Sequence, residues 1–181
     1  MSDIGVLYLE EVFRSLCGIK RQADGAIAQL NDEQFFAVLD AESNSVAIIM
    51  KHMAGNMRSR FTDFLTSDGE KPDRNRDQEF VVAADASRAE IVDAWEKYWQ
   101  LVLGTVKSLT PENLAQPITI RSEPHSVLQA LIRQLAHSSL HAGQIIILAK
   151  HWKGSEWQTL SIPRGKSAEM NAAYAEKFKS S

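Results

Sequence analysis

Residues 126–154 read SVLQALIRQLAHSSLHAGQIIILAKHWKG, and this stretch decides the fold. Its apolar side chains recur at three- and four-residue steps, which is the period of one face of an amphipathic helix. Ser126 and Gln129 stand three residues apart as a capping box, and Gly154 suits the residue that follows a helix end. We therefore predict a long helix that begins at Ser126 and runs to about Trp152.

Three further segments show the same helical period, at about residues 3–30, 46–65 and 87–109. The second follows a cluster of N-cap side chains at 42–45, and the third begins at a capping box. Four long amphipathic segments without a credible sheet predict an all-α protein folded as a four-helix bundle. The loops at about 66–86 and 110–125 are long for an up-down bundle, so we expect at least one crossover connection.

The segments outside these helices carry weaker signals. Residues 72–86 are polar and charged without a helical period, which predicts a solvated loop, whereas the alternating residues 117–121 predict a short extended piece. The tail from about residue 155 is expected to pack irregularly on the bundle, with a short helix at 167–178 and disorder in its last few residues. A chain of 181 residues suits one core, so we expect a single domain over residues 1–181.

Composition narrows the classes of partner and compartment. The formal net charge is −3 and no run of Lys or Arg occurs, so nucleic acid is not an expected partner. No apolar stretch is long enough to span a bilayer, and the first residues lack the positive leader of a signal peptide. Cys17 is the one cysteine and cannot form an internal disulfide, which fits a reducing, cytoplasmic location.

Three histidines form the strongest chemical pattern. His137 and His141 are four residues apart and therefore share one face of the predicted helix, and His52 lies 85 residues earlier on another predicted helix. Facing helices of a bundle can bring such side chains together. Three protein ligands with an open fourth position are typical of a reactive metal centre. The alternative is that these are hydrogen-bonded histidines of the core edge or surface, as we expect for His125 and His151.

Three amides lie near the histidines in the helical pattern. Asn56, Gln134 and Gln144 are candidates for orienting the imidazole rings from a second layer, although they would equally serve to cap or cross-link helices. Arg74 and Arg76 are most simply part of a solvated loop. No carboxylate stands where it would be an evident general base, and no residue is assigned a catalytic role.

The segments MKHMAGN (50–56) and HSSLHAGQ (137–144) resemble the DinB/YfiT-like metalloenzyme superfamily, and the resemblance covers nearly the whole chain. More narrowly, the tail TLSIPRGKS (159–167) is similar to the ending of an uncharacterised branch of that superfamily. The resemblance implies an up-down-down-up four-helix bundle with one long crossover, which is often a homodimer. It also implies a divalent metal, zinc or nickel, held by His52, His137 and His141. Relatives with an assigned activity transfer small thiols such as bacillithiol, mycothiol or glutathione to electrophiles, or isomerise maleylpyruvate.

Three neutral imidazoles would leave the full charge on a divalent ion, which would promote loss of a proton from a bound thiol or water. Our first hypothesis is therefore a metal-dependent enzyme that activates a small-molecule thiol for attack on an electrophile. The second hypothesis is a metal-dependent hydrolase. The absence of an evident general base favours thiol activation over hydrolysis. A bundle that binds a metal or ligand without catalysis is the third.

Overall fold

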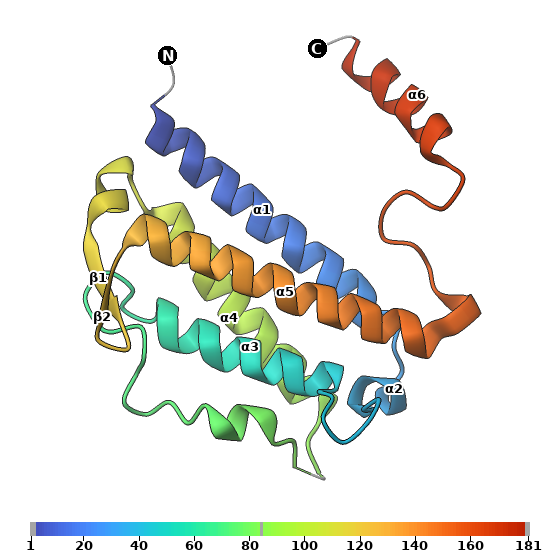
Figure 1. Cartoon of the computed structure of the whole chain (residues 1–181), viewed down its shortest axis with the longest axis horizontal. Helices are drawn as coiled ribbons and strands as arrows, with labels where there is room; N and C mark the ends of the chain where they lie inside the picture. Colours follow the sequence, from blue (N-terminus) through green and yellow to red (C-terminus); the bar gives the residue numbers. More distant parts are fainter. Residues whose placement is uncertain (1–2, 84, 180–181) are drawn as a thin grey trace.

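The computed structural model describes residues 3–83 and 85–179 and shows four long helices packed as a bundle (Figure 1). The bundle helices are α1 (Ile4–Ile27), α3 (Val46–Phe61), α4 (Arg88–Ser108) and α5 (Val127–Lys153). The smaller elements are α2 (Asp32–Phe36), η1 (Asp77–Phe80), η2 (Pro111–Ala115), β1 (Pro117–Ile120), β2 (Glu123–Ser126), η3 (Gly154–Glu156) and α6 (Ser167–Phe178). No helix in the described ranges combines the length and the apolar character that a bilayer crossing requires.

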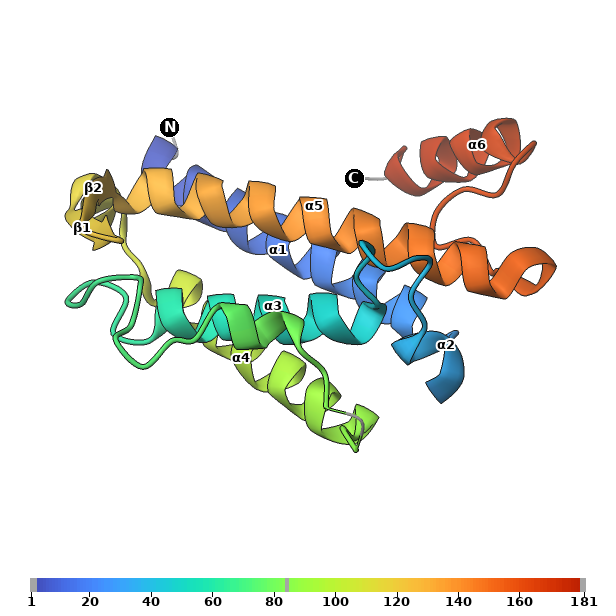
Figure 2. The same ribbon diagram turned by 60° about the horizontal axis from the view of Figure 1, so that its bottom comes forward.

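The helices follow an up-down-down-up order. In Figure 1, α1 and α5 run in one direction and α3 and α4 run in the other, with α1 packed chiefly on α5 and α3 on α4. Because α3 and α4 are parallel, the chain between them must return along the bundle. Residues 62–87 form this crossover, and they carry η1 along the outside of α3 (Figure 2). The predicted all-α bundle with a long crossover is confirmed.

A single continuous apolar core fills the bundle, with contributions from all four long helices. Trp95 and Trp99 of α4 are buried at its centre and meet edge to face, with ring centroids 5.6 Å apart. The indole Nε1 of Trp95 donates to Asp24 Oδ1 of α1 at 2.9 Å. This bond gives one of the two largest buried side chains of the core a polar partner.

The helix starts agree with the sequence more closely than the helix ends. Ser45, Ser87 and Ser126 are N-caps as expected, each accepting a backbone N–H in the first turn. The helix predicted for residues 46–65 ends at Phe61, because Asp63 adopts a left-handed φ of 48° that interrupts the helix. Phe64 nevertheless remains buried. The first helix is also shorter than predicted and ends at Ile27.

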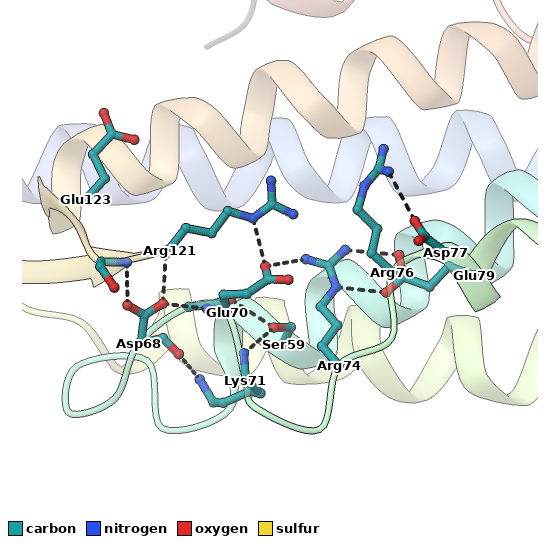
Figure 3. Close-up of polar contacts among 12 residues, drawn as sticks. Ser59, Asp68, Glu70, Lys71, Arg74, Arg76, Asp77, Glu79, Arg121 and Glu123 are labelled. Carbon is teal, nitrogen blue, oxygen red and sulfur yellow. Dashed lines mark hydrogen bonds and ion pairs between the residues drawn. The ribbon is translucent and has the colours of Figure 1, made fainter.

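The expectation that the chain contains no sheet is wrong for one small hairpin. β1 pairs antiparallel with β2, with Ile118 opposite His125. The two-residue turn is formed by Arg121 and Ser122, whose φ angles are 57° and 63°. Such turns usually use Gly or Asn. Here the Asp68 carboxylate accepts the backbone N–H groups of both turn residues at 2.8 Å, which holds the strained conformation (Figure 3).

The tail packs against the bundle only over its first part. Trp157 and Leu160 contact the core cluster, and the backbone N–H of Gln158 donates to Gln29 of α1. The short helix predicted at 167–178 is present as α6, but it buries no residue and stands clear of the bundle (Figures 1 and 2). The disorder predicted for the last few residues concerns in part residues 180–181, which lie outside the described ranges.

Candidate metal centre

The three predicted histidines meet between α3 and α5. His52 is buried in the middle of α3, and His137 and His141 are half-buried one turn apart on α5. One nitrogen from each ring can be chosen so that all three lie within 4.8 Å of one another. The structure therefore brings together the three side chains that the sequence singled out, and this group could hold a metal ion.

The convergence follows from the topology. α3 and α5 run antiparallel in the same bundle, so a residue in the middle of one helix faces the middle of the other. The four-residue spacing of His137 and His141 places both rings on the same side of α5, toward α3. Apolar residues pack on either side of the row formed by His137 and His141, so the imidazoles lie at the edge of the core and not in solvent.

The spacing of the ring nitrogens suits a tetrahedral ion. His52 Nε2 and His137 Nε2 are 3.3 Å apart. Two nitrogens bound to zinc at 2.0–2.1 Å with a tetrahedral angle are separated by about 3.3–3.4 Å. One nitrogen of the third ring, that of His141, lies within 4.8 Å of the other two ligand atoms. The donor set and the spacing thus suit a metal ion.

Glu79 of η1 orients the first of these rings. Its Oε2 atom accepts the Nδ1–H of His52 at 2.9 Å, and both side chains are buried. A carboxylate at Nδ1 fixes the proton there and leaves the Nε2 lone pair directed at the centre. The approach of Glu79 to α3 requires Gly55, because a Cβ atom at this position would lie 2.4 Å from Glu79 Oε1.

Arg74 holds Glu79 in place from the other side. Its Nε and Nη2 donate to the two carboxylate oxygens of Glu79 at 2.8 and 3.0 Å, and its Nη1 donates to Glu70 at 2.9 Å (Figure 3). Glu70 also accepts from Arg121 of the hairpin turn. The Arg74 side chain is only 2% exposed, so the prediction of a solvated loop at this position is wrong. The carboxylates offset the cost of burying its charge.

The three predicted amides lie along the same helices but have different contacts. Gln144 Oε1 accepts the Nδ1–H of His141 at 2.7 Å, as a ring-orienting residue would. Gln134 instead donates to Ser138 of its own helix, and its Oε1 is 3.5 Å from Arg60 Nη1. Asn56 is buried, and its Oδ1 has no hydrogen-bond partner within the described residues.

Electrostatics keep the α5 histidines neutral. Burial, together with the nearby His141, Arg60 and His52, lowers the pKa of His137 to about 3. Burial also lowers the pKa of His141. For Glu79, burial alone would raise the pKa, but the hydrogen bonds from His52 and Arg74 outweigh it, and the pKa lies below its ordinary value. At neutral pH the two α5 imidazoles are therefore neutral and Glu79 is ionised, and neutral imidazole is the form that binds a metal.

The other two histidines and the cavity beside Glu79 are separate from this centre. His125 of the hairpin contacts Glu123 and Arg133, as expected for a surface histidine, and His151 lies against Trp152 near the end of α5. A cavity of about 570 Å³ lies between α3, the crossover and α4. Glu79 and Gly55 form part of its wall, but the three histidines do not.

Glu79 and Arg74 are the functional residues that sequence reasoning missed. They come from an irregular segment whose side chains follow no period, so no spacing linked them to His52. One signal was present: a glycine in the middle of a predicted helix, at Gly55, often marks a close approach by another part of the chain.

Comparisons with known proteins identify a family. Over residues 3–166 the chain matches the family described as "Protein of unknown function (DUF1572)". No curated protein and no solved structure matches the chain. Because the match covers most of its length, the chain belongs to this family.

Proposed function

For this member of the DUF1572 family, we propose a divalent-metal-dependent enzyme that activates a small-molecule thiol at His52, His137 and His141. The observation that carries the proposal is the convergence of three imidazoles, with two Nε2 atoms 3.3 Å apart, at a spacing that fits tetrahedral zinc. The resemblance of the histidine segments to DinB/YfiT-like thiol transferases supports the thiol as co-substrate and zinc or nickel as the metal.

The protein's contribution is to fix the ligands and leave one position open. Glu79 and Gln144 accept the Nδ1–H groups of His52 and His141, which directs the Nε2 lone pairs of these rings inward. A divalent ion bound by three neutral imidazoles would lower the pKa of a thiol or water at the open position. A thiolate is the nucleophilic form of a thiol.

The contacts of Glu79 favour a thiol over water as the group that is activated. Hydrolysis by metal-bound water usually needs a base that can take up a proton. Oε1 of Glu79 accepts from Arg74, and Oε2 accepts from both His52 and Arg74. These bonds hold the carboxylate ionised and occupied, so Glu79 acts as a positioning residue. A thiol gives up its proton more readily and depends less on such a base.

Elemental analysis of untagged protein tests the metal site. We expect about one zinc or nickel ion per chain, with a large loss in His52→Ala and His141→Ala. His125→Ala and His151→Ala are matched controls that remove the same side chain outside the centre, and they should retain the metal. Circular dichroism of every variant separates loss of ligand from loss of fold. Equal metal contents in all four variants would disprove the site.

Turnover assays then separate the chemistries. Metal-loaded protein should conjugate an electrophile such as monochlorobimane in the presence of bacillithiol, glutathione, cysteine or coenzyme A. Chelation of the metal should abolish this rate. Hydrolysis of simple esters or amides without any thiol would point instead to a hydrolase, and metal binding without turnover of either kind would point to a binding protein.

The oligomeric state belongs to the same proposal. We propose a homodimer, in keeping with the superfamily that the chain resembles. α5 carries a second apolar stripe on its outer face, where Ile132, Leu140 and Ile147 are 50–63% exposed. These side chains are spaced at about two-turn intervals, so they fall along one line of the helix. A second copy could cover this line without disturbing the metal centre, whose rings point inward.

A further inference from the structure

One of the three ligand histidines lacks the partner that the other two have. Glu79 accepts the Nδ1–H of His52, and Gln144 accepts that of His141. His137 Nδ1 is buried and has no hydrogen-bond partner within residues 3–83 and 85–179. If His137 binds a metal through Nε2, its proton must sit on Nδ1, where no acceptor from the described chain meets it. Buried hydrogen-bond donors in native proteins are rarely left without an acceptor.

Arg60 lies at the contact between α3 and α5, which we call the seam, and its charge is not paired with a carboxylate within the described residues. Arg60 is half-buried, and among the described residues its buried Nε has no partner and its Nη1 reaches only Gln134 Oε1, at 3.5 Å. Glu70, the carboxylate whose charge acts on Arg60, is already paired with Arg74 and Arg121. Burial and the surrounding arginines lower the pKa of Arg60 to about 10. Partial burial of a cation without a counter-ion is unfavourable, and a bound anion would offset this cost.

The geometry of the two helices directs these groups toward each other. Arg60 lies two turns after His52 on α3, and side chains on a helix lean toward its N-terminus, which is the direction of His52. His137 leans toward the N-terminus of α5, which faces the C-terminal end of α3 because the helices are antiparallel. Gln134, the neighbour of Arg60, is one turn before His137 on α5.

We propose that this seam is an oxyanion subsite, in which a carboxylate or phosphate group of the substrate accepts from Arg60 Nε and from His137 Nδ1. An oxyanion offers two or more acceptor oxygens and a negative charge, so one group satisfies both unpartnered donors and the buried cation.

The inference rests on the proposed metal site and narrows the class of its substrate. The anionic group of a ligand bound here is separated from the metal by the His137 ring, because it contacts Nδ1 while the metal is bound by Nε2. The substrate is therefore a small molecule that carries an oxyanion close to its reacting atom, and a neutral electrophile or thiol would bind poorly. Anion binding also fixes the His137 proton on Nδ1 and so prepares Nε2 for the metal.

Calorimetric titration of the full-length, zinc-loaded protein with inorganic phosphate, and separately with acetate, tests the subsite. Arg60→Gln removes the charge and should weaken binding of the preferred anion by about 10- to 100-fold, the usual effect of losing a charged hydrogen bond. Arg58→Gln is the matched control, because Arg58 is on the same helix but pairs with Asp73. It should leave binding within about 2-fold, since exposed pairs contribute little.

Melting temperatures give a second readout that does not depend on metal or activity. Without anion, Arg60→Gln should melt higher than the unmodified protein because a buried unpaired charge is gone, and added phosphate or acetate should raise the melting temperature of the unmodified protein only. The preferred anion distinguishes a phosphate from a carboxylate substrate. Equal anion binding by both arginine variants, or no binding at all, would overturn the subsite. Anion binding to protein that takes up no zinc would overturn the metal proposal instead.

Discussion

Replacing Gly55 with alanine tests whether the crossover positions the metal centre. A Cβ atom added at this position would lie 2.4 Å from Glu79 Oε1 and 2.7 Å from Glu79 Cδ, whereas ordinary contact begins at 3.4 Å. Glu79 must therefore move away from α3 by about 1 Å. A displacement of that size lengthens the 2.9 Å bond to His52 beyond hydrogen-bond range.

The expected energy change has two opposing parts. Alanine is favoured over glycine in a helix interior by about 1 kcal/mol. Disrupting a buried charge pair costs about 3–5 kcal/mol, and the Arg74 and Glu79 side chains are only 2% and 8% exposed. We expect a net loss of about 2–4 kcal/mol in the free energy of unfolding. Metal affinity should fall about 10- to 100-fold, as for other losses of a ring-orienting carboxylate.

Urea denaturation and a chelator competition measure the two effects. Gly104→Ala in α4 and Gly143→Ala in α5 are matched controls, because nothing lies within 4 Å of a Cβ added at either position. Both should raise stability slightly and leave metal affinity unchanged. If Gly55→Ala behaves like these controls in both assays, Glu79 does not depend on Gly55 and the positioning argument fails.

Three further predictions concern other parts of the molecule. Slight burial would raise the pKa of Asp68, but the backbone N–H groups that it accepts lower it to about 2. The folded pKa is thus below its ordinary value, so the stability that Asp68 gives is present above about pH 4 and disappears as the pH falls toward 2. The difference in urea midpoint between the unmodified protein and Asp68→Asn should shrink over this range, and a constant difference would contradict the assignment. Trp95→Ala should lower the free energy of unfolding by about 3–5 kcal/mol, measured by denaturant titration, because it leaves a cavity in the core and removes the indole donor from Asp24 Oδ1. Leu140→Glu places a charge on the exposed stripe of α5, and sedimentation should show a monomer with unchanged helical content if the stripe is the dimer face; a variant that sediments like the unmodified protein would place the interface elsewhere.

The bundle and the histidine triad were predictable because both depend on local period. Apolar residues at three- and four-residue steps fix which face of each helix is buried, and the same spacing places His137 beside His141. The N-caps at Ser45, Ser87 and Ser126 were equally local and appeared as predicted. The alignment of α3 against α5 is not set by local sequence. In a short bundle, however, two antiparallel helices meet near their middles, so His52 could be predicted to lie near His137 and His141.

The features that the sequence did not predict depend on contacts between segments that share no hydrophobic period. Glu79 reaches His52 from a crossover whose path is set by the parallel packing of α3 and α4, which the sequence pattern does not specify. The hairpin turn at Arg121 and Ser122 carries neither Gly nor Asn, and it is held by Asp68, more than 50 residues earlier. Both features depend on a few polar contacts between distant residues, so composition and periodicity give no sign of them.

The long crossover also has a consequence for folding. His52 meets one partner 27 residues away and another 85 residues away, so the centre is complete only after both the crossover and α5 have docked. Contacts so distant in sequence form slowly because loop closure must precede them. The crossover contains one short helical turn, η1, and is otherwise irregular, so we expect it to open locally at a lower free energy than the four helices. Amide exchange in residues 70–80 should therefore be slowed by metal far more than exchange in the core of α4.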